Sequence, residues 1–300
     1  MDVDTRVLRY FVAVAECLSF TEAANRLYVA QPSLSRQIKQ LEARLGTDLF
    51  VRASSAITLT RAGEALLDAA RQQLSGWQHT LRLVRTAAAA ESNVVRVGFV
   101  ATGGGALARQ ARAVFTERYP DATIAPKRFD WGGEAQALRD GLADIAFVWL
   151  PADLTGLRSR VVADEQRWVA MRSSHPLARQ DKIRIDDLRD EPLMWTRVAS
   201  PEWVDWWAVN PRPDGSTAVW GRENDNVEEM LEHVATATSG VCIGPESMAS
   251  YYTHPDLTWR PLVDVDPLRI ALAWPEDSAS PLVARFAEIA SALADQPSPD

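Results

Sequence analysis

The spacing of apolar residues predicts three helices within the first 46 positions. Residues 5–17 carry an apolar stripe at helical spacing, with the charged side chains off it. Residues 19–22 (Ser-Phe-Thr-Glu) match a capping box, which begins a short second helix that we expect to end near Leu27. Pro32 suits the first turn of a third helix, because its missing N–H has no helical partner there, and Gly46 suits the end of that helix.

The third helix has two faces of different chemistry. One face carries apolar residues at spacings of four, three and four, namely Leu34, Ile38, Leu41 and Leu45. The other face and the start of the helix present an amide, hydroxyls and two cations, from Gln31, Ser33, Ser35, Arg36 and Lys39. Arginine forks onto guanine and glutamine onto adenine, whereas lysine and hydroxyls suit phosphate oxygens. Such a face is what a helix-turn-helix DNA-binding protein requires, although a solvated face in a helical bundle has the same pattern.

A small hairpin follows the three helices. Residues 48–52 and 57–60 have strand patterns, the four residues between them form the turn, and Arg52 lies near its tip. Three helices and a hairpin make a winged helix-turn-helix domain, which favours DNA binding over the bundle.

Residues 61–90 predict one long helix with a repeating apolar seam. Small and apolar residues alternate at steps of four and three, the pattern of a coiled coil. A single helix cannot bury such a stripe, so the same helix of a second subunit is the expected partner, and packing against the chain's own C-terminal domain is the alternative. The expected dimerisation residues are Leu67, Leu74, Trp77, Leu81 and Val84.

Strands and helices alternate in the rest of the chain. Strands are expected at 94–100, 123–129 and 145–150, with helices at 106–119 and 134–141 between them, and this order favours a parallel sheet. Further strands are expected near 161–162, 168–171, 193–196, 217–219, 241–243 and 269–274.

Charge is divided unevenly along the chain, whose formal net charge is −8. Residues 1–90 hold 11 basic and 8 acidic side chains, a net charge of +3, so the remainder carries −11. The excess of three is small, but only this first segment has the sign that suits a polyanion such as DNA.

The sequence contains no run of about 18 apolar residues and no apolar signal core at its start, so neither a membrane span nor secretion is expected. Cys17 and Cys242 lie far apart, without the spacing of a disulfide framework or a metal site. We interpret them as buried thiols and expect a cytoplasmic protein with no metal or other cofactor.

Fixed spacings across residues 8–63 resemble the DNA-binding domain of LysR-type transcriptional regulators. The resemblance is carried by Ser19-Phe20-Thr21-Glu22-Ala23-Ala24, Gln31-Pro32-Ser33-Leu34-Ser35, Leu41-Glu42, Leu45-Gly46, Leu49-Phe50 and Leu59-Thr60 followed by Ala62-Gly63. It implies that the long helix joins subunits, that dimers pair into tetramers, and that the residues at DNA include Gln31, Pro32, Ser35, Arg36 and Arg52. After Arg52 the wing has Ala-Ser-Ser-Ala, where these proteins commonly have another basic residue.

The remaining residues resemble the effector-binding domain of the same family, which looks like a periplasmic binding protein with two lobes. The expected fold class is therefore α+β and α/β, with an N-terminal winged helix-turn-helix (1–60), a long linker helix (61–91) and a two-lobed, periplasmic-binding-protein-like effector domain (92–300). Lobe I is expected at 93–161 and 267–292, and lobe II at 162–266.

Ligands of open α/β sheets bind beyond the carboxyl ends of the strands. Similar regulators place a Ser or Thr at the position of Thr102 to contact the effector, and the backbone amides that follow suit a carboxylate. The expected effector-binding residues are Thr102, Gly103, Asp130, Trp131, Trp149, Arg197, Pro201, Trp203, Asn226 and Pro245. The tryptophans favour an aromatic or otherwise apolar effector, with Arg197 or Thr102 on an acidic group, although each tryptophan is equally well explained as a core residue.

Three other functions fit the sequence less well. An enzyme would need a nucleophile, base or metal cluster at recognisable spacing, and the four histidines are scattered. A redox sensor would need an exposed, activated thiol, and a solute-binding transport module would leave residues 1–60 unexplained. We therefore expect no catalytic residues and a homo-oligomeric, bacterial-type transcription regulator, controlled by a small molecule between the lobes. Its expected partners are double-stranded DNA, further copies of the chain and, as an additional candidate, RNA polymerase.

Overall fold

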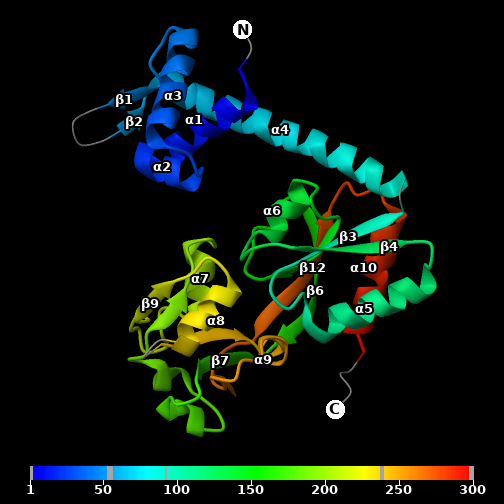
Figure 1. Cartoon of the computed structure of the whole chain (residues 1–300). Coiled ribbons are helices and arrows are strands. Elements are labelled where there is room, and N and C mark those ends of the chain that lie inside the picture. Colours follow the sequence, from blue (N-terminus) through cyan, green and yellow to red (C-terminus); the bar gives the residue numbers. More distant parts are fainter. Residues whose placement is uncertain (1–2, 53–56, 92, 237–239, 297–300) are drawn as a thin grey trace. The chain divides into compact units, whose positions relative to one another are not determined.

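The computed structural model describes residues 3–52, 57–91, 93–236 and 240–296 (Figure 1). The chain divides into two compact units, Met1–Leu81 and Arg82–Asp300, and the long helix α4 (Arg61–Glu91) contributes to both. This differs from the expected division into residues 1–60, 61–91 and 92–300. The linker helix is not a separate part, because its first turns pack into the core of the first unit.

Three helices and a two-stranded hairpin precede α4 in the first unit. Their bounds are α1 (Thr5–Cys17), α2 (Phe20–Arg26), α3 (Gln31–Leu45), β1 (Phe50–Arg52) and β2 (Ile57–Leu59). The Ser19 half of the expected capping box is present, since its Oγ accepts the N–H of Glu22 at 3.2 Å. Gly46 ends α3 with a φ of 69°, in the left-handed region that glycine adopts without strain.

Aromatic rings at the base of the wing complete the core of this unit. Phe50, the first residue of β1, lies 5.5 Å from Phe11 and 5.9 Å from Phe20 between ring centroids. Leu34 and Ile38 of α3 are fully buried beneath them. The predicted apolar face of the third helix is confirmed, and its polar face consequently points away from the core.

The buried carboxylate of Glu42 fixes the wing to α3. It accepts the N–H of Leu49 at 3.0 Å and the N–H of Phe50 at 3.3 Å. Gly63 brings α4 against the same segment, because a Cβ at this position would lie 2.2 Å from the carbonyl oxygen of Leu49. The wing and the start of α4 therefore hold one position relative to α3.

The predicted seam of α4 divides into two parts. Leu67 and Leu74 pack against the core of the chain's own first unit, around the fully buried Ala70. Trp77 and Val84, by contrast, are more than half exposed, and Leu81 is half-buried. Two of the five predicted dimerisation residues, Leu67 and Leu74, thus pack within the chain. The heptad pattern alone could not distinguish this packing from packing between two subunits. Of the helices in the described ranges, none is long and apolar enough to span a membrane.

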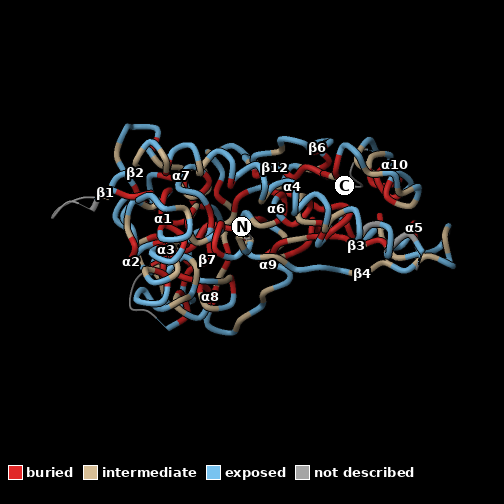
Figure 2. Tube along the Cα trace, turned by 90° about the horizontal axis from the view of Figure 1, so that it is seen from above, coloured by how far each residue is buried: buried red, intermediate tan, exposed pale blue. Residues whose placement is uncertain are grey.

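The first lobe of the second unit is a five-stranded sheet in the order β4-β3-β5-β12-β6. Its strands are β3 (Val94–Phe99), β4 (Thr123–Arg128), β5 (Ile145–Trp149), β6 (Leu157–Glu165) and β12 (Leu268–Pro275). The first three are parallel, as predicted, but β12 runs antiparallel to both β5 and β6, so the sheet is mixed. Strands β5 and β12 are buried along most of their length, and Figure 2 shows buried residues on the inner segments of the trace with exposed residues around them. The helices of this lobe are α5 (Gly105–Arg118), α6 (Glu134–Arg139) and α10 (Pro281–Ala294).

The second lobe is built on the sheet β10-β7-β11 and the smaller pair β8-β9. Its strands are β7 (Arg167–Arg172), β8 (Leu193–Trp195), β9 (Trp220–Glu223), β10 (Cys242–Pro245) and β11 (Leu257–Pro261). The strand expected at 217–219 lies at β9 instead, and β11 was not predicted. The helices are α7 (Pro201–Ala208), α8 (Val227–Thr236) and α9 (Glu246–Tyr251), with short 3-10 turns at Pro176–Arg179 and Ile185–Leu188.

The chain crosses between the lobes later than expected. Strand β6 stays in the first sheet as far as Glu165, which pairs with Leu268 of β12, and β7 of the second lobe begins at Arg167. The expected boundary at 161–162 is therefore wrong by a few residues. The cause is the continuous pairing of β6 with β12 through a register shift at Ile270, which sequence spacing does not reveal.

Replacing Glu42 with leucine is expected to destabilise the first unit by about 3 kcal/mol, because two buried N–H groups lose the acceptor they share. Urea denaturation followed by circular dichroism measures the loss, and amide hydrogen exchange at Leu49 and Phe50 should accelerate. The control is Gln40→Leu, an exposed position of the same helix. Equal effects of the two substitutions would show that the Glu42 carboxylate does not hold the wing.

Candidate functional site

The polar face of α3 is accessible and cationic. Its predicted residues Gln31, Pro32, Ser33, Arg36 and Lys39 are exposed, and Ser35 is half-buried. Within the described residues, neither Arg36 nor Lys39 has an ion-pair partner, whereas Arg26 and Arg71 of the same unit both pair with Glu16. Ala30 precedes the helix and provides no side-chain cap. The face therefore has two cations and the N–H of Gln31 available for an external acceptor, because Pro32 has no N–H and Ser33 donates its N–H to the carbonyl oxygen of Ala30 at 2.9 Å.

Tyr28, beside this face, was missed by sequence reasoning. It lies in the turn between α2 and α3 with a φ of 53°, and its side chain is 96% exposed. A fully exposed ring in the left-handed region has no evident role in folding. A single tyrosine in a turn carries no periodic signal. The wing residue Arg52 ends β1, and the expected departure at 53–56 lies outside the described residues.

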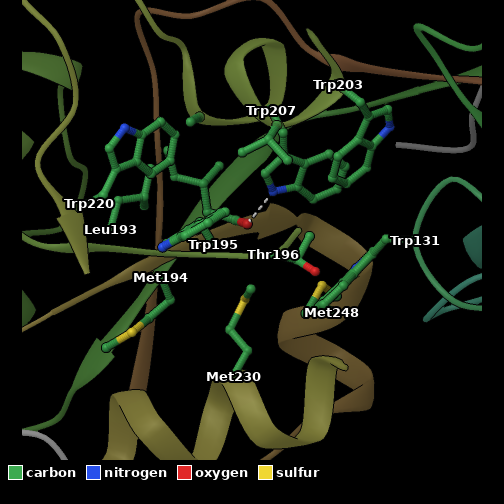
Figure 3. A pocket seen from close by; sticks show the side chains of 13 residues that line it. Trp131, Leu193, Met194, Trp195, Thr196, Trp203, Trp207, Trp220, Met230 and Met248 are labelled. Atoms are coloured by element: carbon green, nitrogen blue, oxygen red, sulfur yellow. Dashed lines mark hydrogen bonds between the residues drawn. The ribbon is translucent and has the colours of Figure 1, made fainter. Parts of the chain in front are cut away.

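A small apolar pocket, with a cavity volume of about 30 Å³, lies in the second unit, mainly within the second lobe (Figure 3). None of its described lining residues is charged. Five are tryptophans and three are methionines: Trp131, Trp195, Trp203, Trp207, Trp220, Met194, Met230 and Met248. Trp131 comes from the loop after β4 of the first lobe, so both lobes contribute. Of the predicted effector residues, Trp131 and Trp203 line this pocket.

Helix α7 supplies a wall of three tryptophans: Trp203, Trp206 and Trp207. Ser200 caps the helix by accepting the N–H of Trp203 at 3.3 Å, and Pro201 occupies its first turn. The rings of Trp203 and Trp207 are stacked 4.7 Å apart, and Trp207 Nε1 donates to the carbonyl oxygen of Ile243 at 2.7 Å (Figure 3). These contacts hold the wall rigidly at one side of the pocket.

Arg167 anchors this wall to the point where the chain crosses between lobes. Its guanidinium lies 4.4 Å above the ring of Trp206, Nε donates to the carbonyl oxygen of Asp266 at 2.9 Å, and Nη1 donates to that of Trp207. Burial lowers the pKa of Arg167 to about 10, and the charge of Asp266 opposes this shift. The group thus remains a cation at neutral pH.

Trp149, the last residue of β5, joins the two lobes without lining the pocket. Its ring meets the ring of Trp207 edge to face at 5.8 Å. The prediction placed Trp149 in a cleft, and the structure places it in a contact that closes the cleft. Opening the lobes would separate these two rings.

A chain of hydroxyls links the lobes at the first turn after β3. Thr102 Oγ1 lies 2.7 Å from Ser247 Oγ, and Ser247 donates both its hydroxyl, at 2.6 Å, and its N–H, at 3.2 Å, to the carboxylate of Glu165. Thr102 is buried and Ser247 and Glu165 are half-buried. Burial raises the pKa of Glu165, whereas the two Ser247 donors lower it and Glu246 raises it.

The glycines that follow Thr102 have positive φ and close neighbours. A Cβ at Gly104 would lie 2.7 Å from the ring of Phe147, and a Cβ at Gly105 would lie 2.6 Å from Glu165 Oε1. The predicted Gly103 packs on Phe99. The start of α5, where an effector carboxylate was expected, therefore already has a carboxylate beside it.

The other predicted effector residues do not meet at the pocket. Arg197 is exposed and pairs with Glu223 at 2.7 Å, and Asp130 is exposed 3.7 Å from Arg128. Asn226 accepts the N–H of Glu229 at 2.8 Å, and Pro245 precedes α9. Each of these side chains has a local partner or a capping position instead of a place in the pocket lining.

Glu134, the first residue of α6, is a buried carboxylate that accepts the N–H of Trp149 at the end of β5. Burial raises its pKa to about 7, opposed by the N–H groups of Glu134 and Trp149, which donate to it. Its Oε1 has no hydrogen-bond partner among the described residues. Neither Glu134 nor Glu165 was singled out from sequence, because a single glutamate near a strand end gives no spacing to detect.

Of the two cysteines interpreted as buried thiols, Cys242 is buried, whereas Cys17 is only half-buried, so that interpretation is wrong for Cys17. No group of three or more His, Cys, Asp or Glu side chains in the described ranges could hold a metal ion. Burial raises the pKa of the Cys242 thiol to about 12, so it stays protonated and unreactive at neutral pH.

A winged helix-turn-helix followed by a two-lobed α/β domain with an apolar pocket defines a class of ligand-responsive DNA-binding regulators. Two family models match this chain. Residues 5–64 match the bacterial regulatory helix-turn-helix protein, lysR family, and residues 88–294 match the LysR substrate binding domain. The chain belongs to the LysR family of transcriptional regulators, which confirms the resemblance found in the sequence.

Named relatives and solved structures each cover more than nine-tenths of this chain. The regulator BudR of Raoultella terrigena is 31% identical over 293 residues, which are 96% of this chain and 100% of BudR. BenM of Acinetobacter baylyi is 30% identical over 92% of each chain. The structure of full-length BenM has a TM-score of 0.57 at 27% identity, over 97% of this chain and 96% of BenM. Full-length CbnR complexed with its target DNA has a TM-score of 0.55 at 26% identity, over 97% and 100%.

Replacing Glu134 with glutamine is expected to stabilise the second unit at high pH but not at low pH. An exposed glutamate titrates near 4.5, so between pH 4.5 and 7 the folded protein holds a proton that the unfolded chain has released, and stability falls as pH rises through this window. Urea denaturation should show a gain on the order of 3 kcal/mol at about pH 8 and none at about pH 4. The control Glu117→Gln removes an exposed carboxylate of α5. Equal gains for Glu134→Gln at both pH values would contradict the assignment.

Proposed function

We propose that this regulator is a cytoplasmic homo-oligomer that recognises operator DNA with the polar face of α3 and responds to a small molecule bound between its lobes. The observation that carries the DNA part is the exposed face on which Arg36 and Lys39 have no ion-pair partner among the described residues. The observation that carries the effector part is the apolar pocket to which both lobes contribute. Neither role requires a catalytic residue.

On DNA, α3 would lie in the major groove with its first turn toward the bases. Arg36 would contact guanine and Gln31 adenine, whereas Lys39 and Ser33 would contact phosphate oxygens. The N–H of Gln31 at the start of α3 and the exposed phenol of Tyr28 would add phosphate contacts. The relative CbnR was solved in complex with its target DNA, which supports this role for the matching domain.

Oligomerisation would use the exposed part of the α4 seam. Trp77 and Val84 present apolar surface that the first unit does not cover, and a second copy of α4 would bury it. A two-fold dimer would place two copies of α3 on paired half-sites. Pairing of dimers into tetramers and a contact with RNA polymerase complete the proposed assembly.

Effector binding would act through the contact between the lobes. In the closed arrangement, Trp149 packs on Trp207 and Thr102 meets Ser247. A ligand that enters between Trp131 and α7 would change the energy of these contacts and thus the balance between closed and open lobes. In an oligomer, that balance would set the separation of the α3 helices and the shape of the bound DNA.

Arg36→Ala is expected to lower the affinity for selected DNA by 1 to 3 kcal/mol, on the order of 10-fold to 100-fold, through loss of a bidentate base contact. The operator is first selected from a random pool of duplexes with the full chain, and affinities are then measured by fluorescence anisotropy in a salt series.

The matched control for this substitution is Arg44→Ala, which removes an exposed cation from the last turn of the same helix. It should leave base selectivity unchanged. If Arg36→Ala weakens selected and unrelated DNA equally, Arg36 contacts phosphate alone, and if no sequence is enriched from the pool, the proposed function fails.

A further inference from the structure

We propose that the ring of Trp131 is an internal plug of the apolar pocket, and that the pocket takes an uncharged bicyclic aromatic group of about the size of indole, which displaces this ring. This inference rests on the proposed effector role of the pocket. The supporting feature is a single side chain of the first lobe that completes a pocket otherwise formed by the second lobe (Figure 3).

Trp131 comes from a different lobe than the rest of the pocket lining. It lies in the loop between β4 and α6 of the first lobe, whereas the other described lining residues all belong to the second lobe. Its side chain is only 7% exposed, and it shares a cluster of buried side chains with Met194, Met230 and Met248. An aromatic ring from one lobe thus occupies space among apolar side chains of the other.

The inserted ring leaves little room for a ligand. The remaining cavity has a volume of about 30 Å³, whereas an apolar cavity that binds benzene has a volume of about 150 Å³. A ligand with an aromatic ring therefore enters only if a lining group moves out. Removal of one indole ring supplies the space for a group of the same size.

Trp131 is the least firmly attached of the stacked and bonded tryptophans around the pocket. Trp207 and Trp195 each donate the indole N–H to a backbone carbonyl oxygen, at 2.7 and 3.2 Å, and Trp203 stacks on Trp207 at 4.7 Å. In the described part of the chain, Trp131 has neither a hydrogen bond from its ring nor a contact with another aromatic ring. Apolar packing alone holds it in the pocket.

The loop that carries Trp131 has the freedom to withdraw it. Gly132 and Gly133 follow directly, and Gly132 has a φ of 73°. A Cβ at Gly132 would have only Ala199 within 4 Å, at 3.8 Å, so this part of the loop is loosely packed. Asp130, on the other side, is exposed. Because glycine adopts many backbone conformations, the ring can leave the pocket without a change in a strand.

The lining sets the chemical class of the group that replaces the ring. Its described side chains carry no charge, and Thr196 is the one hydroxyl among them. An unpaired charge is costly to remove from water, so the part of the ligand inside the lining is uncharged. The three methionines adapt to flat rings of different outline and contact them favourably through sulfur. A planar, apolar ring system therefore fits this lining.

Displacement of the plug would couple ligand binding to the lobes. With Trp131 inserted, its burial stabilises the contact between the first lobe and the second. A ligand in its place makes the same kind of contact with the second lobe alone. The ligand thus competes with a contact between the lobes, and its binding shifts the balance between their arrangements.

Fluorine NMR of the full chain labelled with 5-fluorotryptophan tests the displacement directly. The signal of Trp131 is the one lost in Trp131→Phe. On titration with indole, this signal should move and become sensitive to exchange of H₂O for D₂O, as expected for the reference residue Trp77, which is 51% exposed. A Trp131 signal that stays buried while indole saturates the protein overturns the proposal, as does the absence of indole binding at about 10 mM.

Gly132→Ala tests the competition between ring and ligand without creating a cavity. Alanine in the left-handed region disfavours the inserted form of the loop, so calorimetry should show indole binding at least about fivefold more tightly than to the unchanged protein. The matched control is Gly156→Ala, because Gly156 has a similar φ of 75° and nothing within 4 Å of an added Cβ. Equal indole affinities of the two variants contradict the plug.

Trp131→Ala removes the plug itself. Its affinity for indole should rise at least tenfold, a difference of about 1.4 kcal/mol, whereas Trp77→Ala should bind indole as the unchanged protein does. An unchanged affinity in Trp131→Ala overturns the proposal. Circular dichroism establishes that the variants are folded, and the Gly132→Ala comparison decides the question if Trp131→Ala does not fold.

Selection of operator DNA with the same preparation separates this proposal from the proposed function. If DNA is selected and indole does not displace Trp131, the regulator stands and the plug is wrong. If indole displaces Trp131 and no DNA sequence is enriched, the plug stands as a property of the pocket and the proposed function fails.

Discussion

The geometry of the ligand-binding unit depends on one buried guanidinium, that of Arg167. It lies where the chain passes from the first lobe to the second, and it holds the carbonyl of Asp266 on the returning segment and that of Trp207 at the end of α7. A cation can bridge two carbonyl groups and an indole face at once, which no apolar side chain can do. The tryptophan wall is therefore attached to the segment where the chain crosses between the lobes.

The pocket is apolar, and the polar contacts between the lobes lie beside it and not in its described lining. The tryptophans and methionines supply contact area, but they cannot distinguish one charge from another except through the indole faces. The hydrogen bonds between the lobes come from Thr102, Ser247 and Glu165, which lie outside the described lining of the pocket. The Glu165 carboxylate accepts from Ser247 and thereby holds its hydroxyl where it meets Thr102.

In the DNA-binding unit, too, buried contacts set the position of exposed residues. Its recognition face has few contacts of its own, and its position is set from behind by the buried Glu42 carboxylate and by the close approach of Gly63 to Leu49. These contacts join α3, the wing and the start of α4 into one body. If α4 moves, α3 is therefore expected to move with it, because the two helices are packed together through the wing segment.

The sequence by itself determined the elements whose energetics are local. Helical spacing, the Ser19 cap and Gly46 specify the first three helices, and the polar side of α3 follows from its apolar side, because a helix has a fixed period. Contacts between distant segments were decided only in the tertiary structure. The mixed sheet, the pairing of β6 with β12, the use of Leu67 and Leu74 within the chain, and the meeting of Thr102, Ser247 and Glu165 bring together residues up to 145 positions apart. No local spacing encodes such contacts, since they depend on how whole strands and helices pack.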